Sequence, residues 1–440
     1  MDHFEWVVIG GGPAGFESAL NLAGRGMKVA IVEKRELGGV CLNRGCIPTK
    51  VMISAAKRIE RLKSAKRYGI SMAEPSFSYP TLKRHQERVV KGLRKGLEQR
   101  IREAGITIID GEANLSGQGL VVVTDNNGRK TCSLTFEKVV IASGTAPIIP
   151  SPWMGVEGVV SSEDFWTLDD LPRDILIVGG GVIGCEYASA LSSLGYNITL
   201  VEQMDRVLFT EEPETSEAVS RSLRNGGVRL LTGKRINDIK KTETGLMIEA
   251  GSEFFSSSLV VCCMGRVREK APAGVDLTGV ASLKLDDRTW IAGDIAPGPK
   301  LAHKAAYDAD IIVDHALGRH TEPRYDNIPM AVFTSPEVGR AGLTEEEAKA
   351  RFEVESRTMN LGQMGKAAAD SVSRGFLKIV IDSKSRRVLG MTIVGHEASE
   401  LSGYASLVLH NEMTVDDLGR IVFPHPTLGE IFRETAREFK

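Results

Sequence analysis

The chain has 440 residues, of which 42% are hydrophobic and 25% are charged, and its formal net charge is −2. This composition is typical of a soluble globular protein, and the length predicts two or three domains rather than one core. The small net charge argues against a nucleic-acid binder, and no apolar run is long enough to span a bilayer. The first strand is expected within a few residues of Met1, which leaves no room for a targeting peptide and predicts a cytoplasmic protein.

A glycine-rich segment lies between an apolar strand and a helix at the start of the chain. The strand covers Trp6 to Ile9, the segment is Gly10-Gly11-Gly12-Pro13-Ala14-Gly15, and the helix is expected to run to about Arg25. The next strand leads to Glu33, at the distance where a carboxylate would hold a ribose hydroxyl. This unit predicts a dinucleotide site that uses Gly10, Gly12, Gly15 and Glu33.

Two cysteines, Cys41 and Cys46, follow this unit, and Cys46 lies four residues before Lys50. A thiol pair at the mouth of a dinucleotide site indicates a flavin that exchanges electrons with a disulfide. Such a role requires a thiolate, and therefore a lowered thiol pKa and a nearby base. The other cysteines lie in apolar stretches and are interpreted as small hydrophobic residues: Cys132, Cys185, Cys262 and Cys263.

The segment from residue 57 to residue 102 is strongly basic, with 14 Lys and Arg against 4 Glu, a net charge of +10. Apolar residues recur at helical spacing in its second half, which predicts one amphipathic helix. Two interpretations stay open for its charges: an ordinary solvated helix face, or a docking surface for an acidic partner.

The glycine pattern recurs later in the chain with the same spacing. Strand-like residues 175–178 lead into Gly179-Gly180-Gly181-Val182-Ile183-Gly184, and a second strand at 197–201 ends on Glu202. Eighteen residues separate the last glycine from the acid in both copies. An internal repeat of this kind is unexpected by chance, so a second dinucleotide site is predicted at Gly179, Gly181, Gly184 and Glu202.

The last part of the chain has a different pattern. Strand-like residues 376–381 and 388–394 precede a helix that is expected from about Glu397. Thr344 and Glu347 have the spacing of a capping box at the start of another helix.

The segment Gly38-Gly39-Val40-Cys41-Leu42-Asn43-Arg44-Gly45-Cys46-Ile47-Pro48-Thr49-Lys50 resembles the redox motif of the flavoprotein disulfide reductases. Ala142-Ser143-Gly144-Thr145 and Gly293-Asp294 resemble flavin-binding motifs of the same family. Leu301-Ala302-His303-Lys304-Ala305 and His425-Pro426-Thr427-Leu428-Gly429-Glu430 are similar to its dihydrolipoamide dehydrogenase branch in particular.

This resemblance implies a role for each matching residue. Cys46 would lie beside the flavin ring, Cys41 would exchange with substrate, and His425 would be the base that Glu430 orients. Lys50 and Glu186 would form an ion pair close to the flavin. The remaining residues that the resemblance assigns to cofactor binding are Ser143, Gly144, Gly265, Asp294 and Ala302.

The resemblance also implies the architecture and the partners. The fold class would be α/β, with two Rossmann-like domains for FAD and NAD and a C-terminal α+β dimerisation domain. The expected boundaries are an FAD domain at 1–147, an NAD domain at 148–265, a return to the FAD domain at 266–324 and an interface domain at 325–440. The partners would be lipoamide or a lipoyl-carrying protein and a second copy of the chain, in a homodimer with shared active sites, and no metal is expected.

Two alternatives compete with dihydrolipoamide oxidation by NAD. One is an NADH-dependent reductase of another disulfide, and the other is a role chiefly in assembly with a lipoyl-carrying complex. The intact set of Cys41, Cys46, Lys50, His425 and Glu430 argues against assembly as the sole function. Phe423-Pro424 departs from the pattern of many lipoamide dehydrogenases, which leaves the shape of the substrate channel open.

Overall fold

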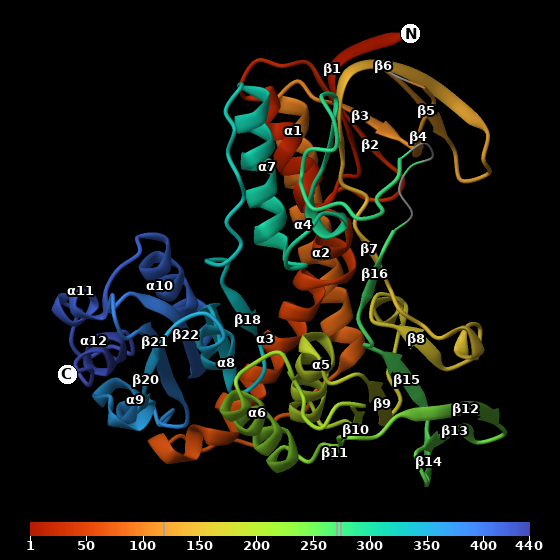
Figure 1. Cartoon of the computed structure of the whole chain (residues 1–440). Helices are drawn as coiled ribbons and strands as arrows, with labels where there is room; N and C mark the ends of the chain where they lie inside the picture. Colours follow the sequence, from red (N-terminus) through yellow and green to blue (C-terminus); the bar gives the residue numbers. More distant parts are fainter. Residues whose placement is uncertain (118, 270–271, 273–274) are drawn as a thin grey trace.

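The computed structural model describes residues 1–117, 119–269, 272 and 275–440. The N-terminal sheet has the order β3-β2-β1-β6-β5-β4, and β17 pairs with β6 in parallel although it comes much later in the chain. Figure 1 shows helix α7, which follows β17, lying beside α1 on this sheet. The elements of this part are β1 (Asp2–Ile9), α1 (Pro13–Ala23), β2 (Val29–Glu33), α2 (Gly39–Arg44), α3 (Cys46–Ser64), α4 (Tyr79–Glu103), β3 (Thr107–Asp110), β4 (Glu112–Leu115), β5 (Leu120–Thr124), β6 (Lys130–Ile141), β17 (Thr289–Ile291) and α7 (Ala302–Ala316).

The second sheet, in which all strands are parallel, has the order β11-β10-β9-β15-β8, with a separate antiparallel sheet β12-β13-β14 beside it. The short ribbon of β7 and β16 connects this part to the first one. The elements are β7 (Thr145–Pro147), β8 (Val159–Ser161), β9 (Asp174–Val178), α5 (Val182–Ser193), β10 (Asn197–Val201), α6 (Pro213–Asn225), β11 (Arg229–Leu231), β12 (Ile236–Thr242), β13 (Gly245–Ala250), β14 (Glu253–Ser257), β15 (Leu259–Cys262) and β16 (Arg266–Arg268).

The C-terminal part is an antiparallel sheet of order β18-β19-β22-β21-β20 with helices packed around it, drawn in blue in Figure 1. Helix α8 begins with the predicted capping box of Thr344 and Glu347. The elements are β18 (Met330–Val332), β19 (Glu337–Gly342), α8 (Glu345–Lys349), β20 (Val354–Asn360), α9 (Gly365–Ala369), β21 (Phe376–Asp382), β22 (Val388–Gly395), α10 (Ala398–His410), α11 (Val415–Arg420) and α12 (Glu430–Ala436).

Buried ion pairs join the second part to the C-terminal part. The Lys378 ammonium on β21 lies 3.2 Å from Glu212, at the start of α6, and within its own part it also lies 2.7 Å from Glu345. Arg340 on β19 lies 2.8 Å from the buried Glu211. Charges removed from water are tolerated only when they are paired, so these contacts fix how the two parts pack together.

The predicted α/β fold class is confirmed, with two Rossmann-like units and a C-terminal α+β part. The structure differs from the sequence expectation at the ends of the first elements. Strand β1 begins at Asp2 rather than at Trp6, because the long strand β6 supplies pairing partners as far as Leu134. Helix α1 ends at Ala23, where Gly24 and a positive-φ Gly26 form a turn.

The predicted domain boundaries fall in connecting segments. Residues 147 and 265 lie at the ribbon formed by β7 and β16, and residue 324 lies between α7 and β18. The boundaries themselves stay predictions. Among the described residues, no helix is both long and apolar enough to cross a membrane.

Helix α4 contains two interior glycines, Gly92 and Gly96, whose added Cβ atoms would meet no atom within 4 Å. We expect Gly96→Ala to stabilise the protein by about 0.5–1 kcal/mol, because alanine loses less backbone entropy in a helix. The thermal midpoint should rise by about 1–2 °C in a chain of this size. Gly184→Ala is the control, since its Cβ would lie 1.9 Å from the Gly179 carbonyl oxygen, and it should lower the midpoint. A lower midpoint for Gly96→Ala would contradict the expectation.

Candidate active site

One cavity of about 1660 Å³ runs between the two glycine-rich turns and is lined by most of the predicted site residues. The predicted residues that line it are Gly10, Gly12, Glu33, Cys41, Cys46, Lys50, Ser143, Gly144, Gly179, Gly181, Glu186, Glu202, Gly265, Asp294 and Ala302. Gly15, Gly184, His425 and Glu430 are not among the lining residues. The thiol pair therefore shares one continuous space with both predicted dinucleotide sites.

The two turns are held by the same pair of hydrogen bonds. The backbone N–H of Gly11 donates to one Glu33 oxygen at 2.5 Å, and that of Arg35 donates to the other at 2.8 Å. In the second copy, Gly180 donates to Glu202 at 2.5 Å and Met204 donates to its other oxygen at 2.7 Å. Each carboxylate thus braces its own glycine loop from the edge of the cavity, and the sequence repeat is also a repeat of contacts.

The last glycine of each turn has a packing role. A Cβ on Gly15 would lie 1.8 Å from the Gly10 carbonyl oxygen, and one on Gly184 would lie 1.9 Å from that of Gly179. These contacts let each helix start directly against its strand. Gly15 and Gly184 consequently stand behind the turns rather than at the cavity surface.

The residues present fit dinucleotides bound at both turns. Gly12 and Gly181 are the N-cap residues of helices α1 and α5 and supply no side-chain cap, so the first free N–H groups of each helix are available to an anion such as a pyrophosphate. The buried hydroxyl of Ser143, which lines the cavity, has no hydrogen-bond partner in the described structure. Bound groups with phosphate and polar ring edges would satisfy both features.

The segment that carries the two cysteines, residues 38–50, is called the redox loop, and it packs against the first glycine turn at residues 10–15. Cys41 lies in the short helix α2 and Cys46 is the first residue of α3, with Gly45 between the two helices. Gly39, at the start of α2, has a φ of 57°, and its Cβ would lie 2.8 Å from the Cα of Gly12. Only glycine permits this approach, which brings the cysteines to the dinucleotide site.

The two thiols have different acidities. A hydrogen bond from Cys41 is the largest cause that lowers the pKa of Cys46 to about 7; burial opposes it, and the charge of Lys50 adds to it. The same hydrogen bond, followed by burial, raises the pKa of Cys41. The two directions make Cys46 the more readily ionised thiol of the reduced pair.

Lys50 joins three parts of the chain. Its ammonium contacts both oxygens of Glu186 on α5, at 3.0 and 2.9 Å, and lies 4.1 Å from the ring centroid of Phe333. The backbone N–H of Phe333, just after β18, donates to Glu186 at 3.0 Å. The predicted ion pair is thus nearly buried at the Glu186 end and is fixed by a residue that sequence reasoning did not identify.

A second buried pair holds the turn that carries Asp294. Lys304 and Asp308 on α7 are fully buried and 2.8 Å apart. Lys304 donates to the Gly293 carbonyl at 3.1 Å, and Asp308 accepts from the Gly293 N–H at 2.8 Å. Asp294 then faces the cavity and accepts from the Thr145 hydroxyl at 3.0 Å. The four-residue spacing of Lys304 and Asp308 on a helix was a signal that could have identified this pair.

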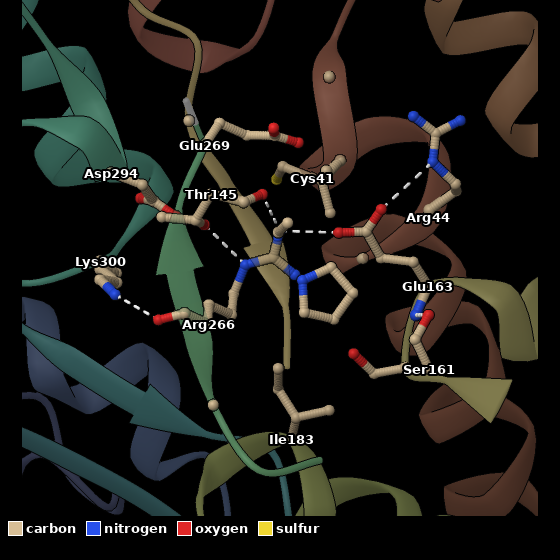
Figure 2. A pocket seen from close by; sticks show the side chains of 18 of the residues that line it. Cys41, Arg44, Thr145, Ser161, Glu163, Ile183, Arg266, Glu269, Asp294 and Lys300 are labelled. Carbon is tan, nitrogen blue, oxygen red and sulfur yellow. Dashed lines mark hydrogen bonds and ion pairs between the residues drawn. The ribbon is translucent and has the colours of Figure 1, made fainter. Parts of the chain in front are cut away.

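A polar network that the sequence did not predict crosses the cavity wall (Figure 2). Arg266 donates to the Thr145 hydroxyl at 2.8 Å and to Glu163 at 2.7 Å. The other oxygen of Glu163 lies 3.6 Å from Arg44, which also binds Glu36 at 2.8 Å. Arg44 stands between the two cysteines in sequence, so the network ties the redox loop to both dinucleotide-binding parts.

His425 and Glu430 lie together but away from this cavity. His425 Nδ1 is 2.8 Å from a Glu430 oxygen, and the other oxygen accepts from the Thr427 N–H at 2.8 Å. The Thr427 hydrogen bond, and then His425, lowers the pKa of Glu430. With a proton on Nδ1, the basic nitrogen is Nε2. The His425 side chain is 79% exposed, so within one chain the structure does not bring this pair to the thiols.

Comparisons with known proteins agree with this organisation. Residues 4–309 match the family described as pyridine nucleotide-disulphide oxidoreductase, and residues 328–436 match the dimerisation domain of that family. A dihydrolipoyl dehydrogenase of Chlamydia pneumoniae is 33% identical over 98% of this chain and 96% of its own length. One from Chlorobaculum parvum is 34% identical with the same coverage.

Solved structures give the same result. The Cu(II) complex of the HOCl-induced flavoprotein disulfide reductase RclA from Escherichia coli superposes with a TM-score of 0.89 at 25% identity and covers all of both chains. LpdA from Mycobacterium tuberculosis has a TM-score of 0.91 at 24% identity, which shows a shared fold. The chain therefore belongs to the pyridine nucleotide-disulphide oxidoreductase family, an enzyme family whose cofactors are FAD and NAD(H).

Proposed function

We propose that this protein is a dihydrolipoyl dehydrogenase that passes electrons between dihydrolipoyl groups and NAD through FAD and the Cys41–Cys46 pair. The observation that carries the proposal is the thiol pair itself, which lies in one cavity with both dinucleotide turns and has one thiol with a lowered pKa and one with a raised pKa. The relatives named dihydrolipoyl dehydrogenase, matched over nearly the whole chain, support the choice of substrate.

The residues at the two turns would hold the cofactors. The turn with Gly10, Gly12 and Glu33 would take FAD, with Ser143, Gly144, Asp294 and Ala302 around it, and the turn with Gly179, Gly181 and Glu202 would take NAD. When bound, FAD would supply the redox chemistry that links hydride transfer at the nicotinamide to electron-pair transfer at a disulfide. Lys50, paired with Glu186, would place a fixed positive charge beside that exchange, and Gly265 would line the path between the sites.

The thiols and the base would divide the work of disulfide exchange. In dihydrolipoyl oxidation, His425 takes a proton from one substrate thiol, and the resulting thiolate attacks Cys41 of the oxidised pair. Cys46 leaves as a thiolate, which its low pKa favours. The substrate is now joined to Cys41 in a mixed disulfide. Its second thiol attacks the substrate sulfur of that bond, the displaced Cys41 takes up the second proton, and the substrate closes its disulfide. The pair is left reduced as a Cys41 thiol and a Cys46 thiolate, with the first proton on His425.

The position of His425 supports a homodimer with shared sites. Within one chain the imidazole is highly exposed and stands outside the cavity that holds the thiols. A two-fold dimer formed through the dimerisation domain would bring His425 of one protomer to Cys41 of the other. We also place the protein in the cytoplasm, where the four cysteines outside the redox pair would stay reduced.

The function is tested with FAD-loaded protein, using NADH or NADPH against lipoamide, glutathione disulfide and other small disulfides. We expect the highest kcat/KM with lipoamide. NADH should exceed NADPH by about one to three decades, because the Glu202 carboxylate would repel a 2′-phosphate by up to about 4 kcal/mol at 4 Å and intermediate dielectric. Preference for another disulfide would replace this proposal with the reductase alternative, and equal efficiencies of the two nucleotides would refute the role of Glu202.

The acidity of Cys46 is tested by the rate of iodoacetamide labelling against pH in the reduced protein. The half-point for Cys46 should lie near pH 7, its pKa being about 7. Cys41→Ala should move this half-point upward, because the variant loses the hydrogen bond that favours the thiolate, and Lys50→Met should move it upward through the lost positive charge. Glu186→Gln should move it downward. An unchanged half-point in Cys41→Ala would contradict the assignment.

Co-expression of two inactive chains tests the shared site. Cys41→Ser and His425→Gln should each lose nearly all turnover. Every mixed dimer would contain one doubly damaged site and one intact site, and random pairing makes about half of the dimers mixed, so activity should recover to about a quarter of wild type. Mixed dimers isolated through two affinity tags and found inactive would show that each site lies within one chain.

A further inference from the structure

Charge is segregated in this molecule. The whole chain has a net charge of −2, whereas residues 57–102 alone carry +10. Two of these basic residues are paired within the chain: Lys83 contacts Asp169 at 2.7 Å, and Lys57 contacts Glu337. Others are exposed on α3 and the turn after it, and a further group lies on the outer side of α4.

Five basic side chains form a stripe along α4, which we call the basic stripe: Arg84, Arg88, Lys91, Lys95 and Arg102. At 100° per residue they fall within a sector of about 60°, and they extend over about 27 Å of the helix. All five are exposed. The buried residues of the helix, among them Val90, Leu97 and Ile101, lie on the opposite side.

The stripe is only partly neutralised within the chain, because Glu87 and Glu98 lie one helical turn before Lys91 and Arg102 without forming an ion pair with them. Among the described residues, no Asp or Glu forms an ion pair with any of its five members, and Arg84 donates only to the Thr81 hydroxyl at 3.0 Å. Five like charges on one helix face repel one another, which weakens the isolated fold. A partner of opposite charge would remove that repulsion.

The glycines of α4 border the stripe. Gly92 and Gly96 are exposed, are four residues apart, and have open space where a Cβ would stand. Nothing in the chain requires glycine at either position, although each weakens the helix. Two adjacent positions without side chains let another surface approach the helix backbone beside Lys91 and Lys95. The glycines therefore point independently to a contact on this face.

Helix α4, which carries the basic stripe, is hydrogen-bonded to the redox loop on its inner side. Arg94, on the inner flank of α4, donates to the Asn43 side chain at 3.4 Å, and Asn43 lies between the two cysteines. Asn43 in turn donates to the carbonyls of Leu37 and Gly39 at 3.0 and 2.9 Å. A partner on the outer face would stand about one helix diameter, roughly 10–12 Å, behind the loop that carries Cys41.

We infer that the basic stripe docks an acidic protein domain that carries the disulfide substrate on a flexible side-chain arm. The inference rests on the proposed function for the identity of that substrate. A nucleic acid fits less well, because the remainder of this chain is acidic and would repel a polyanion, and no aromatic side chain lies in the stripe to stack on bases. Charge complementarity would steer the domain to the helix and raise its rate of encounter.

The test compares Arg88→Gln/Lys91→Gln/Lys95→Gln with the control Arg25→Gln/Arg129→Gln/Arg173→Gln. The control changes three exposed basic residues elsewhere, so the two variants have the same net charge. The substrates are free lipoamide, a lipoylated protein domain of net negative charge and a lipoylated domain of net positive charge. Turnover and direct binding of each domain are measured at low and at physiological ionic strength.

With the acidic lipoylated domain at low ionic strength, the stripe variant should lose about ten- to a hundredfold in kcat/KM and weaken binding in parallel. The control should change less than about twofold, and neither variant should alter kcat/KM for free lipoamide. Added salt should weaken the binding of the acidic domain to the wild-type protein and barely change its binding to the stripe variant. Either of two results would overturn the inference. Equal losses of kcat/KM in both variants would indicate an effect of net charge alone, and no loss in either would leave the stripe as a solvated helix face.

Other outcomes identify other occupants. Dissociation of the stripe variant into monomers in sedimentation would make this face a contact between copies, and loss of RNA binding with no effect on the acidic domain would make it a nucleic-acid surface; either result overturns the inference. Absence of turnover with free lipoamide in the wild type would refute the proposed function alone, because binding of the acidic domain is read separately.

A glycine variant distinguishes contact from simple attraction. Gly92→Gln should raise the thermal midpoint, since glutamine favours the helix, and should weaken binding of the acidic domain severalfold by filling the space beside Lys91. Unchanged binding in Gly92→Gln would show that the partner does not approach the helix closely and would refute docking on this face.

Discussion

The ion pair of Lys50 and Glu186 is the interaction on which the organisation of this protein depends. Lys50 belongs to the helix that begins at Cys46, Glu186 belongs to the helix of the second glycine turn, and Phe333 of the C-terminal part binds the same carboxylate through its backbone. Three regions of the chain therefore meet at one buried charge. Because an unpaired carboxylate is costly in such a place, the pair aligns the thiols with the second dinucleotide turn and also holds the third region against both.

The repeated turn shows how strongly local sterics constrain such a site. Gly10 and Gly179 have φ angles of 104° and 108°, and a Cβ on the last glycine of each turn would clash with the carbonyl oxygen of the first. The braces from Glu33 and Glu202 match within a tenth of an ångström or so. The two glycine turns have nearly the same backbone geometry but different neighbouring residues. The same local structure can therefore bind two different ligands, with specificity set by the residues that reach across the cavity.

The features that sequence predicted are those that a short segment specifies alone. The glycine turns, the capping box at Thr344 and the amphipathic helix α4 depend on neighbours within one or two turns of chain, and each left a recognisable pattern. Arg266 and Glu163 are 103 residues apart, and their contact depends on how β7 and β16 return to each other. The bond from Phe333 to Glu186 uses a backbone N–H, which has no sequence signature. The predicted pair of His425 and Glu430 was found together, yet in the proposed dimer its relation to Cys41 would depend on a second chain.

The exposure of His425 has a consequence for how the protein matures. A single chain already has both glycine turns and both thiols in one cavity, so under the proposed function it would hold the parts that take up cofactors and cycle the internal disulfide. With the proposed assignment it lacks only the base, which arrives with the partner. Electron flow to an external dithiol would then begin at assembly rather than at folding, and dilution would silence substrate turnover while leaving the internal redox pair intact.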